Sequence, residues 1–134
     1  MAKDVPVRVI TGATAGIGRA LAKRLASGGV VALVARDREK AEAARSEILS
    51  AVPDASVEVY VADLSSQSDV RSLASQLSAA HPRITALVNV AGVFSSQRVE
   101  TADGLELMFA TNHLAPFEEQ QRLWQVSEQL TGLA

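Results

Sequence analysis

The sequence predicts an α/β domain in which parallel strands form a sheet and helices cover both of its faces. Short runs rich in Val and Ile alternate with longer segments whose apolar residues recur every three or four positions. The chain has 134 residues, of which 48% are hydrophobic and 21% are charged, so one packed core is expected. This alternation favours a three-layer fold with crossover helices between neighbouring parallel strands.

Four strands and the helices between them are expected in a regular order. The Val- and Ile-rich runs predict strands over residues 7–10, 30–35, 57–62 and 86–90. Apolar residues at helical spacing predict helices over residues 17–25, 41–48 and 70–77. After the fourth strand, the same spacing predicts a helix over residues 105–112 and a last helix that contains Leu123, Val126 and Leu130.

Turn and capping residues support these boundaries. Gly28 and Gly29 can end the first helix before the second strand, and Pro53 separates the second helix from the third strand. Ser66 precedes Asp69 by three residues, which is the spacing of a capping box at the start of the third helix.

Charge and composition exclude several classes of function. Thirteen basic and fifteen acidic residues give a net charge of -2, and the chain has no cysteine, so thiolate zinc sites, disulfide scaffolds and thiol catalysis are excluded. The balanced charge and the small number of aromatic residues disfavour a nucleic-acid partner. No segment has the length of a membrane span or the pattern of a signal peptide, so we expect a cytoplasmic protein without a membrane partner.

A glycine-rich segment joins the first predicted strand to the first predicted helix. It runs from Thr11 to Gly18 and contains Gly12 and Gly16. Gly12 permits a tight turn, Gly16 lets a pyrophosphate approach the backbone, and Gly18 allows the helix to pack closely on the sheet. The amides of the first helical turn, which includes Ile17, would then face the phosphates at the positive end of the helix dipole. An ordinary strand-to-helix turn is the alternative interpretation.

Four motifs occur in the order that they have in the short-chain dehydrogenase/reductase family. They are the Gly-x-x-x-Gly-Ile-Gly spacing of residues 12–18, Asp63-Leu64 after the third strand, Asn89-Val90-Ala91-Gly92 after the fourth, and Thr111-Asn112-His113-Leu114. With the run Arg36-Asp37-Arg38-Glu39-Lys40, they make residues 7 to about 117 resemble the branch of the family that contains retinol dehydrogenases.

The resemblance implies a Rossmann-type, doubly wound parallel sheet, truncated to about four strands in the order 3-2-1-4, with a dinucleotide across the carboxyl ends of the strands. Residues 1–117 would form the dinucleotide-binding domain, and residues 118–134 an amphipathic helix of the same domain. The expected cofactor contacts are Thr11, Gly12, Gly16, Ile17, Gly18, Arg36, Asp63, Leu64, Asn89, Ala91 and Gly92.

The choice between NADP and NAD depends on the end of the second strand. An acidic side chain at this point would bind the ribose 2′-hydroxyl of NAD, but Ala35 occupies the position and Arg36 follows it. A guanidinium group there can pair with a 2′-phosphate, so NADP is expected, with NAD still possible. The alternative interpretation has Arg36 in solvent and Asp37 on the ribose. Asp63 could equally be the N-cap of the third helix.

The family's catalytic set is only partly present. In the family, a Tyr acts as acid and base, a Lys four residues later lowers its pKa, a Ser polarises the carbonyl group, and an Asn completes the set. Asn112 is the only matched member, because the single tyrosine, Tyr60, lies in the third predicted strand and is followed four residues later by Leu64. The lysines stand at positions 3, 23 and 40, and Ser95 and Ser96 follow the fourth strand instead of the fifth.

Three functions therefore stay open for the chain. The first is an NADP(H)-binding homologue without catalysis, the second an active oxidoreductase with a non-standard acid, and the third a non-enzymatic partner of full-length relatives. Residues 122–133 resemble the C-terminal helix of full-length members of the branch, as if the catalytic half were left out, although a generic amphipathic helix is the alternative. Because residues 86–90 would lie at the edge of the sheet, a homo-oligomer or association with a relative is also expected.

Two remaining features receive structural interpretations. His81 and His113 have no carboxylate neighbours in their motifs, so neither a metal site nor a nucleophile is expected there. Leu123 and Trp124 could form a partner-binding face, but packing on their own domain is favoured.

Overall fold

The computed structural model describes residues 5–131, with side chains as far as Trp124, and these residues form two compact units. The first unit contains the chain up to Val61 together with Ile84–Val90, and the second contains Ala62–Arg83 and the chain from Ala91 onward. The expected side-chain positions of Val126 and Leu130 lie outside the described residues.

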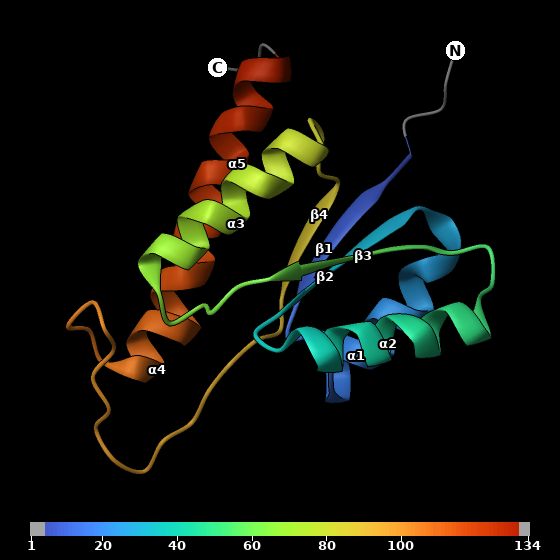
Figure 1. Cartoon of the computed structure of the whole chain (residues 1–134). Helices are drawn as coiled ribbons and strands as arrows, with labels where there is room; N and C mark the ends of the chain where they lie inside the picture. The colour runs from blue at the N-terminus through green and yellow to red at the C-terminus, as the bar shows by residue number, and fades with distance from the viewer. Residues whose placement is uncertain (1–4, 132–134) are drawn as a thin grey trace. The chain divides into compact units, whose positions relative to one another are not determined.

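A four-stranded parallel sheet forms the centre of the first unit (Figure 1). Its strands are β1 (Val7–Thr11), β2 (Val30–Ala35), β3 (Ser56–Val61) and β4 (Ala86–Asn89), in the order β3-β2-β1-β4. Each predicted strand is found to within about one residue at either end. The α/β, Rossmann-type fold class and the strand order 3-2-1-4 are therefore confirmed.

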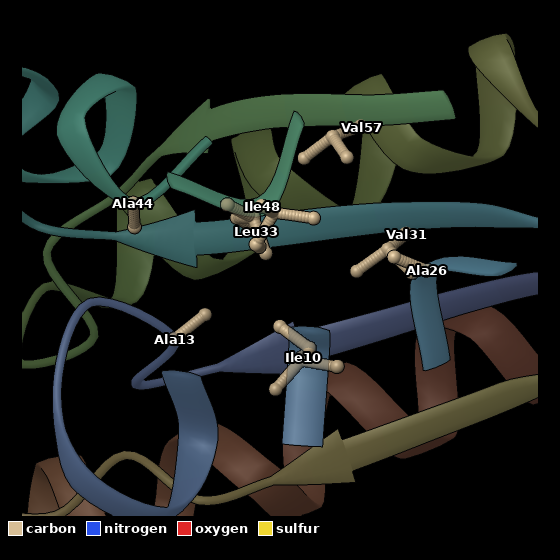
Figure 2. Close-up of a cluster of buried hydrophobic side chains, with 9 residues drawn as sticks. Ile10, Ala13, Ala26, Val31, Leu33, Ala44, Ile48 and Val57 are labelled. Atoms are coloured by element: carbon tan, nitrogen blue, oxygen red, sulfur yellow. The ribbon is translucent and has the colours of Figure 1, made fainter. Parts of the chain in front are cut away.

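Helices α1 (Gly16–Leu25) and α2 (Arg38–Ala51) belong to the same unit and pack on the sheet. A short 3-10 turn, η1 (Ala26–Gly28), follows α1 where the two glycines were expected to end it. The core of the unit combines side chains from these strands and helices, and Figure 2 shows Ile10, Leu33 and Ile48 pointing into it. All three are fully buried, as the apolar periodicity predicts.

The second unit is helical. Helix α3 (Gln67–Ala80) begins after Ser66, whose hydroxyl group accepts a hydrogen bond from the Asp69 amide at 3.3 Å, so the predicted cap is confirmed. Later in the chain, α4 (Leu107–Phe109), the π-helical segment η2 (Ala110–Leu114) and α5 (Ala115–Thr131) follow one another without a break. Helix α5 lies beside α3 (Figure 1).

The expectation of two separate helices after the fourth strand is wrong, because the helical run is continuous from residue 107. It begins later than expected because Glu106 caps it, accepting hydrogen bonds from the amides of Met108 at 3.0 Å and Phe109 at 2.7 Å. Leu105 belongs instead to a turn closed by the Thr101 amide, which donates to the Leu105 carbonyl group at 2.7 Å.

Two kinds of feature are absent from the part of the chain that the structure describes. No helix within residues 5–131 combines the length and the apolar character that crossing a bilayer requires. Among the side chains described, those of residues 5–124, no three His, Asp or Glu groups gather in an arrangement that could ligate a metal ion.

Candidate dinucleotide site

The glycine-rich loop between β1 and α1 has the backbone of a tight strand-to-helix turn. Gly12 has a φ of 66° and Gly16 a φ of 50°, both in the left-handed region that glycine adopts without strain. A Cβ atom at Gly18 would overlap the carbonyl oxygen of Gly12. Glycine at position 18 is therefore required by the close approach of the first turn of α1 to the loop after β1. The expectation that this glycine lets the helix pack closely on the sheet stays a prediction.

The amino end of α1 leaves room for a negatively charged group. Ala15 occupies the N-cap position, and its side chain makes no capping hydrogen bond to the first turn. A Cβ atom at Gly16 would have no atom within 4 Å, and the side chain of Ile17 is 78% exposed. Backbone amides at an uncapped, open helix start can hold an anion such as a phosphate group.

The pairing of the strands brings several of the predicted residues to one edge of the sheet. Thr11 is in register with Val34 of β2 and with Asn89 of β4. The glycine loop and Arg36 therefore follow the carboxyl ends of β1 and β2, and Asn89 is the last residue of the adjacent strand β4. In open α/β sheets, ligands bind beyond this edge.

The side chain of Thr11 has a role that the sequence analysis missed. It is 1% exposed, and its hydroxyl oxygen accepts a hydrogen bond from the Val90 amide at 3.2 Å. This bond fixes the start of the segment after β4 relative to the end of β1. Threonine at the end of a buried strand, before a glycine, is too common in sequences to have indicated the contact.

The two candidate ribose ligands after β2, Arg36 and Asp37, differ in their surroundings. Ala35 is 8% exposed, and the side chain of Arg36 is exposed. Asp37 is the N-cap of α2, and its carboxylate accepts a hydrogen bond from the Lys40 amide at 3.1 Å. One carboxylate oxygen of Asp37 is thus committed to its own helix, whereas the guanidinium group of Arg36 faces solvent.

Asp63 and Leu64 lie in the second unit, at the start of the turn before α3. The Asp63 carboxylate accepts hydrogen bonds from the amide and the hydroxyl group of Ser65, at 2.9 and 2.7 Å, and the Asp63 amide donates to Asp69 at 2.9 Å. Asp63 is therefore not the N-cap of α3, because Ser66 takes that position. Leu64 is buried, at 8% exposure.

Asn112 holds the chain after the Asn-Val-Ala-Gly motif. Its side-chain amide makes two hydrogen bonds with the backbone of Val93, accepting from N–H and donating to C=O, both at 2.8 Å. A Cβ atom at Gly92 would lie 3.5 Å from the Asn112 Oδ1 atom, and Ala91 precedes it in the same segment. Asn112 lies in the π-helical segment η2, and such segments are frequent at functional sites.

Two other groups near the predicted motifs have defined partners. The carboxylate of Glu106 accepts two backbone hydrogen bonds, which lower its pKa below the ordinary value of 4.5. His113 is exposed and stacks on Phe109, with ring centroids 5.4 Å apart, in agreement with a structural role. Neither contact was foreseen, because each depends on the exact start and pitch of the helix.

The single tyrosine has none of the surroundings of a catalytic acid. The Tyr60 hydroxyl group donates to Glu58 on the same strand at 2.9 Å. Burial raises the pKa of Tyr60 to about 12, helped by the hydrogen bond and by the charge of Glu58. Lys23 lies on α1 and Lys40 on α2, while Lys3 lies outside the described residues.

Comparison with known proteins establishes the family. The family model described as short chain dehydrogenase matches residues 6–130. The chain belongs to the short-chain dehydrogenase family. Among curated members, human retinol dehydrogenase 13 is 37% identical over 110 residues, which are 81% of this chain and 33% of that protein. Mouse retinol dehydrogenase 12 is 39% identical over 112 residues, 83% of this chain and 35% of that protein.

The retinol-dehydrogenase-like branch inferred from the motifs is thus confirmed, and the chain spans about a third of the length of these curated relatives. Solved structures of family members agree with the fold. A metagenomic short-chain oxidoreductase in complex with NADP superimposes with a TM-score of 0.76 at 33% identity, covering 90% of this chain and 56% of that one. A short-chain dehydrogenase from Sphingobium yanoikuyae in complex with NADPH gives 0.75 at 31% identity, covering 89% and 47%.

Proposed function

We propose that this chain binds NADP(H) at the carboxyl edge of β1, β2 and β4 and does not itself catalyse hydride transfer. The observation that carries the proposal is the glycine loop, whose open space at Gly16 and uncapped helix start suit the phosphates of a dinucleotide. The nicotinamide group of such a cofactor would supply or accept a hydride only where a catalytic set is also present. The residues of the chain hold and orient the cofactor.

The position of Arg36 supports NADP(H) over NAD(H). Among the described residues, none is hydrogen-bonded or ion-paired with the Arg36 side chain, whereas Asp37 is committed to the start of α2. A guanidinium group in solvent, directly after the second strand, is suited to pair with a 2′-phosphate group. Two of the similar solved structures contain NADP or NADPH, which agrees with this preference.

The surroundings of Tyr60 and Asn112 support the absence of turnover. The Tyr60 hydroxyl group is bonded to a carboxylate on its own strand, and the residue four positions later is Leu64. Asn112 uses both ends of its amide on Val93. Ser95, the serine after β4, donates its hydroxyl hydrogen to the Gln97 carbonyl group at 2.7 Å.

The cofactor preference is tested by titrating the protein with NADPH and NADH. We expect NADPH to bind roughly ten- to a hundredfold more tightly, as one charge-assisted contact would provide. Arg36→Ala should remove most of this difference and leave NADH binding nearly unchanged. Arg38→Ala is the matched control, because Arg38 is also exposed but pairs with Glu42 at 3.9 Å. Equal affinities in the unaltered protein would contradict the preference.

The absence of catalysis is tested separately, at NADPH concentrations that saturate the protein. We expect no oxidation of NADPH above background with a panel of aldehydes and ketones, since a positioned proton donor alone contributes about 10² to 10⁴ in rate. Steady oxidation that is lost in Tyr60→Phe would overturn this part of the proposal. It would favour the alternative of an active oxidoreductase with a non-standard acid.

A further inference from the structure

Glu119 is a buried carboxylic acid without a partner. The residue is 2% exposed, and both carboxylate oxygens are shielded from solvent and make no hydrogen bond with any described residue. An ionised carboxylate in such a place loses its hydration, and no hydrogen bond or ion pair compensates for this loss. Burial accordingly raises the pKa of Glu119 from 4.5 to about 7.

The acid lies in the middle of the buried side of the last helix. Thr111, Ala115, Glu119 and Leu123 are spaced four residues apart, and all four are buried. The opposite side of the same helix exposes aromatic rings, with Phe117 at 53% and Trp124 at 62% exposure. Both Leu123 and Trp124 were expected to pack on their own domain. This is confirmed for Leu123, which is buried, and wrong for Trp124, whose side chain is mostly exposed.

Helix α3 lies beside α5 and has a buried, apolar side of its own. Its buried residues are Val70, Leu73, Ala74 and Leu77. An aliphatic surface offers a carboxylate no donor. Thr111, on the same buried side of the helical run as Glu119, has a hydroxyl group that is itself without a hydrogen-bond partner in the described part of the chain.

The arginines on these two helices pair with a carboxylate other than Glu119. Arg71 of α3 and Arg122 of α5 both donate to the same oxygen of Glu118, at 2.9 and 3.0 Å. Among the side chains that the structure describes, the remaining titratable groups on α3, at its carboxyl end and on the helical run with α5 are Asp69, His81, Arg83, Glu106 and His113. Asp69 accepts from the Asp63 amide at 2.9 Å and from the Ser66 hydroxyl group at 3.3 Å, and His113 stacks on Phe109.

We propose that Glu119 makes the packing of α5 against α3 depend on pH. With its carboxyl group neutral, the helix stays packed. When Glu119 loses its proton, the part of α5 around it separates from α3 so that the carboxylate reaches water. This inference does not depend on cofactor binding.

The test uses Trp124, the only tryptophan of the chain, which lies on α5 five residues after Glu119. Trp124 emission and its quenching by iodide are followed from pH 5 to pH 9 in the unaltered protein. We expect a transition with a midpoint near pH 7. In Glu119→Gln, which keeps the size of the side chain without an ionisable group, we expect no transition.

Two control variants separate Glu119 from its neighbours. Glu118→Gln removes the adjacent, paired carboxylate and should keep the transition, and so should His113→Gln, which removes the imidazole group of the same helical run. Circular dichroism at pH 5 confirms that each variant is folded. The inference is overturned if the unaltered protein shows no transition, or if the transition survives in Glu119→Gln.

Discussion

Gly16 and Gly18 lie two residues apart in the first turn of α1, yet they meet different requirements. Gly18 is constrained by its neighbours, because a Cβ atom there would overlap the Gly12 carbonyl oxygen. Gly16 is constrained only by its backbone, with a φ of 50° and open space around it. Gly18 therefore determines whether the loop can form, and Gly16 determines which groups can approach it.

Gly18→Ala should lower the free energy of unfolding by roughly 1–3 kcal/mol, the usual cost of forcing extra atoms into a packed region. Gly92→Ala is the control, because its added Cβ atom would make an ordinary contact, 3.5 Å from Asn112 Oδ1. Urea unfolding of both variants measures the difference. Equal stability of the two would mean that the loop rearranges without cost.

The unpaired carboxyl group of Glu119 gives a prediction for stability. Since burial raises its pKa from 4.5 to about 7, the folded protein binds more protons than the unfolded chain between these values, and stability falls as pH rises through them. The loss is complete above pH 7 and amounts to about 3 kcal/mol. Glu119→Leu should therefore be more stable than the unaltered protein at pH 8 by at least this order. The advantage should shrink at pH 4, and urea unfolding at both pH values measures it.

At the scale of elements, the strands and the glycine loop could be predicted from the sequence, whereas the helical run after β4 could not. The strands follow from local runs of Val and Ile, and the α3 start follows from the spacing of Ser66 and Asp69. The π-helical turn at residues 110–114 shifts the helical period in its middle. A regular 3.6-residue period therefore predicted two helices where the structure has one. It also could not predict the two hydrogen bonds between the Asn112 side chain and the Val93 backbone.

Asn112→Ala should release the segment after β4. Loss of both hydrogen bonds to Val93 should lower the free energy of unfolding by about 1–2 kcal/mol. Asn112→Asp keeps the acceptor for the Val93 amide but loses the donor to the Val93 carbonyl group. Its free energy of unfolding should lie between those of the unaltered protein and Asn112→Ala. Hydrogen exchange of the Val93 amide measures the release directly. An unchanged exchange rate in Asn112→Ala would contradict the role of the clamp.

At the scale of the whole molecule, the edge of the sheet formed by β4 is the feature with the widest consequence. Among the described strands, β4 pairs only with β1, and its sequence Ala-Leu-Val-Asn has no Lys, Pro or charged residue that would blunt an edge. Unpaired backbone groups of such a strand favour pairing with another chain. The same feature supports the third function considered from the sequence, association with a relative.

We expect the protein to self-associate in a concentration-dependent way. Light scattering from low to high micromolar concentration should show an increasing mean mass, because pairing at the β4 edge gains hydrogen bonds that the single chain lacks. A monodisperse monomer at high micromolar concentration would mean that the edge is sealed within the chain.

The measurement closest to the central claim is a calorimetric titration with NADPH of the unaltered protein and of Gly16→Asn. Asparagine tolerates the positive φ of position 16, but its side chain would project into the open space assigned to the phosphates. Gly104→Asn is the matched control, at a φ of 75° outside the loop. The account predicts saturable binding by the unaltered protein and by the control, and at least a tenfold loss of affinity in Gly16→Asn with little change in Tm. No saturable binding by the unaltered protein, or full affinity in Gly16→Asn, would contradict it.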